Sequence, residues 1–101
     1  MAKVVDLLEQ LSYKCVRGNL DKEITKICYD SRKVTEGSLF ICIEGSNFDG
    51  HTVAAEMVEK GAACLVVSKE VEIPKTADVT VIMVEDTRYA MAFISAAYFN
   101  H

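Results

Sequence analysis

Several features are scarce in this chain of 101 residues, and each absence narrows what the protein can be. There is no tryptophan and only one proline, and no apolar run approaches the roughly 18–20 residues of a membrane-spanning helix. Basic residues are outnumbered, with 11 lysines and arginines against 15 aspartates and glutamates and a net charge of −4. Because binding to phosphates needs a basic surface, neither a nucleic acid nor an anionic membrane is expected as the main partner.

The residues that are present favour one folded domain. Half of the chain is hydrophobic (50%) and about a quarter is charged (26%), whereas a disordered tail would be poorer in apolar residues. The length suits a single domain. Residues 1–3 do not open a secretory signal, so we expect a cytoplasmic location.

The four cysteines form no metal-binding or disulfide pattern. They include no CxxC pair, and no histidine lies at ligand spacing from any of them, so no zinc site is expected. Cys28, Cys42 and Cys64 lie inside apolar runs, which predicts reduced thiols that serve as small core residues. No histidine is tied to a cysteine by sequence, and a catalytic cysteine would need such a base.

The hydrophobic pattern predicts alternating helices and strands. We expect helices over about 4–11, 52–61 and 86–99, and strands over 24–30, 39–43, 64–68 and 79–84. This order implies at least one right-handed βαβ unit. The expected fold is α/β, a small two- or three-layer domain with a mostly parallel or mixed sheet and flanking helices. Gly61 is expected to end the middle helix in a left-handed conformation, and Gly45 and Gly50 to supply unusual dihedral angles.

One loop lies between a predicted strand and a helix, and it nearly matches a phosphate-binding motif. Residues 45–52 differ from the pattern GxxxxGK[ST] at one place, where His51 stands instead of lysine. Asp49 adds a carboxylate that would repel phosphate, so a working ATP loop is not expected. Two interpretations stay open: an ordinary turn capped by Asp49 or Thr52, and a contact for an anion or polar ligand through the helix N–H groups.

A second polar cluster, Asp30–Lys33, directly follows a predicted strand. Ser31 offers a hydroxyl and Arg32 a guanidinium that suits phosphate or carboxylate, although the cluster could equally form a local turn. If the strands predicted over 24–30 and 39–43 are parallel neighbours, the loops that follow them both leave the edge of the sheet where ligands collect in open α/β folds. The residues alone therefore predict a small binding domain, with no catalytic group and no metal ligand.

The same loops carry a resemblance to a known family. Asp30–Val34, Gly37–Ile41, Gly45 and Asp49–His51 stand in an order and spacing that resemble the N-terminal domain of the Mur ligases, ATP-dependent enzymes that add amino acids during peptidoglycan synthesis. Around this pattern, Glu85–Arg88 and the closing residues look like the ligases that add the third residue, meso-diaminopimelate or L-lysine. The sister ligases that add D-Ala-D-Ala share the central pattern and are the nearest alternative.

The resemblance also implies a binding site. It implies that the domain holds the uridine-diphosphate end of UDP-N-acetylmuramoyl-L-Ala-D-Glu, with Ser31 on the UDP-sugar and Tyr29 beside the uracil. Ser46, Asn47 and Phe48 occupy the loop positions from which the family touches the nucleotide.

By the same resemblance, residues 1–86 form this UDP-substrate-binding domain and residues 87–101 lead into a central ATPase domain. ATP and Mg²⁺ would belong to the complete enzyme with its central and C-terminal domains. This stretch would bind neither and would not catalyse the reaction. The last helix has no stop signal, and two interpretations stay open: the natural polypeptide continues beyond it, or the polypeptide ends there. An alternative hypothesis, from a different functional class, is a protein-interaction domain in which Phe48 and the helix Tyr89–Phe99 face a partner.

Overall fold

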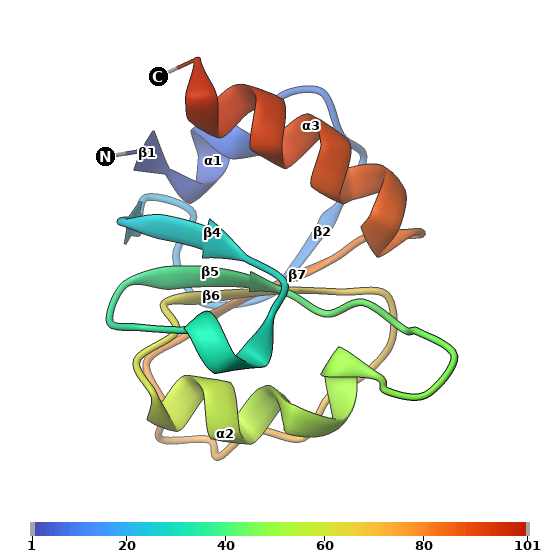
Figure 1. Ribbon diagram of the computed structural model, residues 1–101. Helices are drawn as coiled ribbons and strands as arrows, with labels where there is room; N and C mark the ends of the chain where they lie inside the picture. Colours follow the sequence, from blue (N-terminus) through green and yellow to red (C-terminus); the bar gives the residue numbers. More distant parts are fainter. Residues whose placement is uncertain (1, 101) are drawn as a thin grey trace.

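The structure, a computed structural model, describes residues 2–100 and is built around a mixed five-stranded sheet (Figure 1). Its order is β2-β7-β6-β5-β4, formed by β2 (Lys14–Arg17), β4 (Lys26–Cys28), β5 (Ser38–Ile41), β6 (Cys64–Val67) and β7 (Thr80–Met83). Four strands run parallel, and the edge strand β2 pairs antiparallel with β7. A separate antiparallel ribbon consists of β1 (Ala2–Lys3) and β3 (Glu23–Ile24).

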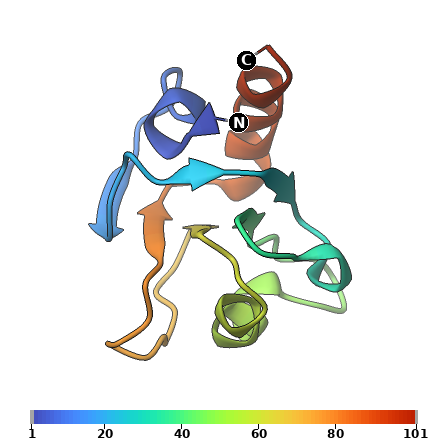
Figure 2. The same cartoon turned by 90° about the vertical axis from the view of Figure 1, so that its left-hand side faces the viewer.

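Helices cover both faces of the sheet, so the domain has three layers. Figure 2 shows α1 (Val4–Leu7) and α3 (Thr87–Phe99) on one face and α2 (Ala54–Glu59) on the other. Two short 3-10 turns, η1 (Ser31–Lys33) and η2 (Gly50–Val53), complete the element list. Among residues 2–100, no helix combines the length and apolar character needed to cross a membrane. The predicted α/β class is confirmed, and β5, α2 and β6 form a parallel crossover unit.

The sheet divides the buried residues into two clusters. Residues from the α1–α3 side, such as Leu7, Ile82 and Ile94, form one cluster, and residues from the α2 side, such as Phe40 and Met57, form the other. All four residues of β5 and of β6 are buried, because strands covered on both faces have no side for water. Since α3 contributes to the first cluster, it packs as part of this core, and the division of the chain after residue 86 stays a prediction.

The cysteines follow the sequence prediction. All four are free thiols, and Cys42 and Cys64 are buried while Cys28 is half-buried. Burial raises the pKa of Cys42 to about 12 and also raises the pKa of Cys28 and Cys64. The thiolate that nucleophilic chemistry requires is therefore disfavoured at all three positions.

Three segments differ from the predicted elements. The opening helix ends at Leu7 rather than near residue 11, and the strand predicted over 24–30 is split between β3 and β4 because the two halves pair with different partners. Strand β2 was not predicted. It is a short edge strand whose register shifts between Cys15 and Arg17, so its sequence lacks the regular alternation by which strands are recognised.

The glycines correct one expectation. Gly61 has a φ of +105° and ends α2 as predicted, but Gly45 and Gly50 do not have positive φ, so the prediction of unusual dihedral angles is wrong for both. Gly50 is needed for space: a Cβ there would lie 3.1 Å from the Ile43 nitrogen and 3.2 Å from the Cys42 Cα. The start of η2 thus packs directly against the backbone at the end of β5.

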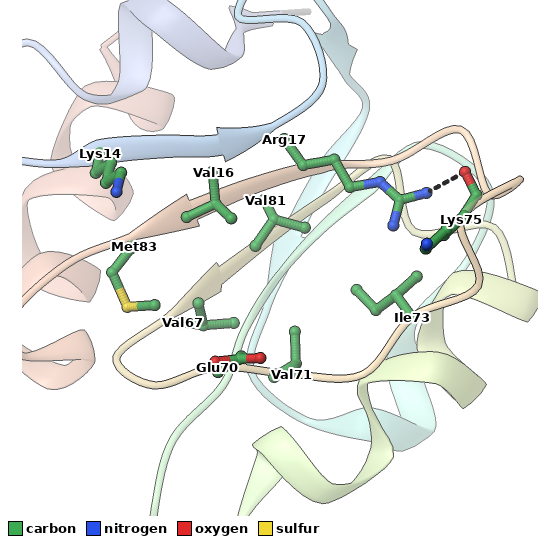
Figure 3. A pocket seen from close by; sticks show the side chains of 10 residues that line it. All are labelled: Lys14, Val16, Arg17, Val67, Glu70, Val71, Ile73, Lys75, Val81 and Met83. Atoms are coloured by element: carbon green, nitrogen blue, oxygen red, sulfur yellow. Dashed lines mark hydrogen bonds between the residues drawn. The ribbon is translucent and has the colours of Figure 1, made fainter.

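Helix α2 leaves part of its face of the sheet uncovered. Over β2 and β7 the cover consists of the loop after β6, and a groove of about 670 Å³ remains (Figure 3). We call it the β2–β7 groove. It is lined by Lys14, Val16, Arg17, Val67, Glu70, Val71, Ile73, Lys75, Val81 and Met83.

Candidate functional site

The two polar loops predicted from the sequence leave the same edge of the sheet. Strands β4 and β5 are parallel neighbours, with Lys26 opposite Ser38 and Cys28 opposite Phe40. The segments that follow them therefore start side by side at the carboxyl ends of the strands. The sequence analysis assumed that the strands before the two loops are parallel neighbours, and the structure confirms this assumption.

The first loop, after β4, is tightened by an internal ion pair. The Asp30 carboxylate accepts hydrogen bonds from the Arg32 backbone N–H at 3.0 Å and from its guanidinium at 3.0 and 2.9 Å. These bonds, the side-chain ones above all, lower the pKa of Asp30 to about 2. The local-turn interpretation therefore holds for Asp30 and Arg32, because the guanidinium is engaged with its own loop.

Tyr29 and Ser31, predicted as binding residues, lie on either side of Asp30. Tyr29 is 61% exposed and lines a cavity of about 310 Å³ between β4 and α3, together with Met91 and Phe99. Ser31 begins η1, where its carbonyl accepts a hydrogen bond from Lys60 Nζ at 3.3 Å. Its hydroxyl makes no hydrogen bond within residues 2–100, which leaves it free to bond a ligand.

The second loop is a tight hairpin after β5, which we call the 44–49 hairpin. Its two stems meet at an antiparallel bridge between Glu44 and Asp49, and the Gly45 N–H donates to the Phe48 carbonyl at 2.8 Å. Ser46, Asn47 and Phe48 form its exposed tip, with Phe48 51% exposed. In the described part of the chain their side chains make no hydrogen bond, so the tip presents all three outward.

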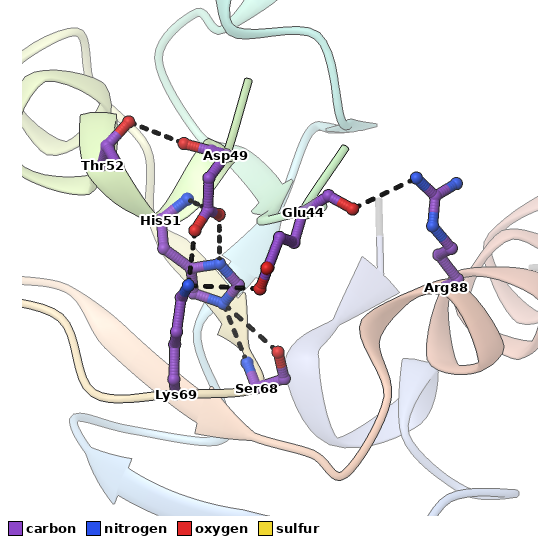
Figure 4. Close-up of polar contacts among 7 residues, drawn as sticks. All are labelled: Glu44, Asp49, His51, Thr52, Ser68, Lys69 and Arg88. Atoms are coloured by element: carbon purple, nitrogen blue, oxygen red, sulfur yellow. Dashed lines mark hydrogen bonds and ion pairs between the residues drawn. The ribbon is translucent and has the colours of Figure 1, made fainter. Parts of the chain in front are cut away.

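The base of the hairpin is clamped from two other elements (Figure 4). Lys69, just after β6, places its Nζ 3.2 Å from Glu44 Oε1 and 2.5 Å from Asp49 Oδ2, bridging the two stems. Arg88 in the first turn of α3 donates to the Glu44 carbonyl at 3.3 Å. The pKa of Asp49 is lowered, mainly by the Lys69 ammonium and also by the hydrogen bonds from His51, so the carboxylate stays charged at neutral pH.

His51 ties this loop to the end of β6. Its side chain is buried, with Nδ1 at 2.7 Å from Asp49 Oδ1 and Nε2 accepting the Ser68 backbone N–H at 3.0 Å. Since Nε2 accepts, we assign the ring hydrogen to Nδ1, which donates to Asp49. Of the two caps considered, Asp49 fills the role at η2, where it accepts the His51 backbone N–H at 3.0 Å.

These contacts do not fit a loop that holds the phosphates of ATP. The position of the motif's lysine is occupied by a buried imidazole with both nitrogens bonded, and the amide that could meet a phosphate is bonded to Asp49. Within residues 2–100, there is also no group of three or more His, Cys, Asp or Glu side chains placed to hold a metal ion.

The structure brings the predicted binding residues to one edge but not into one cavity. The cavity beside Tyr29 is lined neither by Ser31 nor by the tip of the 44–49 hairpin. Sequence reasoning also missed the residues that hold the hairpin, Ser68, Lys69 and Arg88, because they lie far along the chain. One signal was available for Lys69: it directly follows a predicted parallel strand and so belongs to the same edge of the sheet.

Comparisons with known proteins agree on one family. Residues 23–99 match the family described as "Mur ligase family, catalytic domain". A UDP-N-acetylmuramoyl-L-alanyl-D-glutamate--2,6-diaminopimelate ligase from Clostridium perfringens is 38% identical over 95 residues, which is 94% of this chain and 19% of that enzyme. A UDP-N-acetylmuramyl-tripeptide synthetase from Oceanobacillus iheyensis is 42% identical over 96 residues, 95% of this chain and 19% of the synthetase.

The fold has relatives among solved structures as well. The crystal structure of MurF from Acinetobacter baumannii superposes with a TM-score of 0.77 at 25% identity, over 94% of this chain and 20% of that one. This chain thus spans about a fifth of the length of the proteins it matches.

Proposed function

The chain belongs to the Mur ligase family, and from this premise we propose that it binds the uridine-diphosphate end of UDP-N-acetylmuramoyl-L-Ala-D-Glu. The complete enzyme would be a cytoplasmic ligase that adds diaminopimelate or lysine in peptidoglycan synthesis. Support comes from relatives at 38–46% identity whose names describe ligases of UDP-N-acetylmuramoyl-L-alanyl-D-glutamate with 2,6-diaminopimelate.

The observation that carries the proposal is the shape of the 44–49 hairpin. Lys69, Arg88 and His51 hold its base, while its tip keeps three side chains unbonded within the described residues. A loop already fixed in its binding conformation loses little entropy when a ligand arrives. The Ser31 hydroxyl and the Tyr29 ring lie on the adjacent loop, so hydrogen-bond donors and aromatic surface meet at one edge, as a nucleotide with a planar base and a diphosphate requires.

We further propose that this stretch orients the nucleotide substrate and does not carry out the ligation. When bound by the complete enzyme, ATP with Mg²⁺ would activate a carboxylate of the substrate. The residues at 45–52 do not fit that role, because Asp49 and His51 fill the place where phosphate and lysine would lie. The step would therefore depend on parts of the ligase outside this chain.

A second candidate is the corresponding domain of a ligase that adds D-Ala-D-Ala, favoured by the superposition on MurF. The third-residue ligases remain the first choice, since the identity to them reaches 46% against 25% for the superposed MurF.

The test is an NMR amide titration of this chain with UDP-N-acetylmuramoyl-L-Ala-D-Glu, with ATP as the control ligand. We expect shifts at residues 29–32 and 45–51 with the substrate and none with ATP. Shifts confined to α3 and Phe48 on addition of another protein, with none from the nucleotide, would support the protein-interaction alternative instead.

A pair of serine variants sharpens the test. Ser31→Ala should weaken substrate binding while changing the free energy of unfolding by less than about 1 kcal/mol, since the hydroxyl has no partner in the described chain. Ser12→Ala, at an exposed serine outside residues 29–32 and 45–51, is the matched control and should bind as the parent does. Equal affinity of the two folded variants would remove Ser31 from the site.

A further inference from the structure

The β2–β7 groove lies away from the proposed nucleotide site, at the other end of the sheet. The order β2-β7-β6-β5-β4 puts the nucleotide loops near β4 and β5 and the groove over β2 and β7. Its floor is apolar, formed by Val67, Val81 and Met83 from the strands and closed at the side by Val71 and Ile73. A volume of about 670 Å³ falls within the ordinary range of small-molecule pockets.

Cations on the rim of this groove have no carboxylate partner. Lys14, Arg17 and Lys75 line the groove, and none of them forms an ion pair within residues 2–100. The groove is lined by one acidic residue, Glu70. This excess of positive charge stands out on a chain with a net charge of −4.

The positive charge is concentrated at one end. Figure 3 shows Arg17 and Lys75 together on one side of the groove, with Lys14 and Glu70 toward the other. The Arg17 guanidinium is fixed there because its Nη2 donates to the carbonyls of Pro74, Lys75 and Ala77 at 2.8, 3.1 and 2.6 Å.

Fixing Arg17 through neutral carbonyls has a consequence for binding. The carbonyls hold the guanidinium without cancelling its charge, and its Nε and Nη1 donors make no hydrogen bond to the described residues. Because Nη2 belongs to both bidentate edges of the guanidinium, the free Nε–H and Nη1–H groups face different sides, and each can donate a single hydrogen bond to a carboxylate oxygen. The apolar floor begins beside it, where Val16 is 52% exposed and Val81 is buried.

We propose that the β2–β7 groove binds a small organic monoanion with an apolar body, of the kind represented by a medium-chain carboxylate. The carboxylate lies at Arg17 and Lys75, and the hydrocarbon chain covers Val16, Val81 and Met83. The positive charges of Arg17 and Lys75 favour an anionic head group, and the valine-rich floor favours an apolar body. At the far end the charges of Lys14 and Glu70 offset each other, so nothing there attracts a second anionic group, and the ligand carries one.

The experiment is an NMR amide titration of the whole chain with three matched probes: sodium octanoate, octan-1-ol and sodium octanedioate. Octanoate should shift residues 14–17, 67–75 and 81–83 and bind about threefold more tightly than octan-1-ol, the contribution of one exposed ion pair. Octanedioate should bind no more tightly than octanoate, because its second carboxylate gains no net attraction at the end lined by Lys14 and Glu70. Because these probes contain no nucleotide, the result is independent of the function proposed above.

Two variants and a control locate the contacts. Lys75→Gln should reduce the preference for octanoate over octan-1-ol, with Arg17 left as the remaining cation, and should not weaken binding of the alcohol. Val16→Asp should weaken both probes, and its exposed position keeps the fold intact, as the amide spectrum will show. Lys3→Gln, which replaces an exposed lysine outside the groove, should bind as the parent does. Equal binding of acid and alcohol, an unchanged preference in Lys75→Gln, shifts outside the groove, or no shifts at millimolar octanoate would each overturn the proposal.

Discussion

The 44–49 hairpin and the β2–β7 groove use charged side chains in opposite ways. In the hairpin, Lys69 and Asp49 are bonded to each other and to neighbours, so their charges hold the shape of the loop. In the groove, Lys14 and Lys75 have no ion pair within the described chain, and Arg17 is fixed only through carbonyl oxygens. A charge that is already paired stabilises structure, whereas an unpaired one stays available to a ligand.

The largest loss of stability is expected at His51, the buried residue that ties the 44–49 hairpin to the end of β6. His51→Ala should lower the free energy of unfolding by about 2–4 kcal/mol, because it removes a buried ring and leaves the Ser68 N–H without its acceptor. Urea unfolding measures the loss. Thr52→Ala removes one exposed hydrogen bond next door and should cost about 1 kcal/mol or less. Equal losses in the two variants would mean that His51 does not hold the loop.

The second-largest loss of stability is expected at Gly50, which packs against the backbone at the end of β5. Gly50→Ala should cost about 1–2 kcal/mol, since its Cβ would press on the backbone of Cys42 and Ile43, which the sheet holds in place. Gly45→Ala meets the Phe48 carbonyl at 3.1 Å, but this carbonyl belongs to an exposed tip that can move, so the cost should be smaller. Thermal unfolding of both variants measures which substitution costs more stability.

The third expected effect is a change in the pKa of Asp49 when Lys69 loses its charge. In Lys69→Gln the pKa of Asp49 should rise toward its ordinary value of 3.8, because Lys69 is the main cause of its depression. The carboxyl carbon shift of Asp49, followed by NMR against pH, measures this directly. Lys60→Gln is the control, because Lys60 contacts the Ser31 carbonyl and not Asp49. A pKa that stays low in Lys69→Gln would assign the depression to His51 alone.

The same titration has a consequence for acid stability. The pKa of Asp49 is lower in the folded chain than in the unfolded one, so its contribution to stability is fully present above about pH 4 and is lost as the pH falls through the folded pKa. The hairpin should therefore keep its amide shifts at pH 3, where ordinary carboxylates are mostly protonated. Loss of those shifts between pH 4 and pH 3 would contradict the assignment.

The smallest effect is expected in the groove. The double substitution Lys14→Gln and Lys75→Gln should change the free energy of unfolding by less than about 0.5 kcal/mol, because neither lysine is in an ion pair within the described residues. Urea unfolding beside the parent is the measurement. A larger loss would show that these charges support the fold and would erase the contrast with the hairpin.

Much of the fold could be predicted because its signals are local. The continuous apolar runs of β5 and β6, the stop at Gly61 and the Asp86 cap of α3 each depend on a few consecutive residues. Strand β2 escaped because an irregular edge strand leaves a weak pattern, and the need for Gly50 was misjudged because it arises from a backbone distant by several residues.

The sequence by itself determined that two polar loops follow strands, which residues they hold and which family they resemble. Only the tertiary structure decided what those loops can do. Lys69 and Arg88 reach the hairpin from β6 and α3, and Arg17 reaches the loop at Pro74–Ala77 from β2. Hydrogen bonds and ion pairs act over a few ångströms, so a side chain's role depends on neighbours in space that its neighbours in sequence do not reveal.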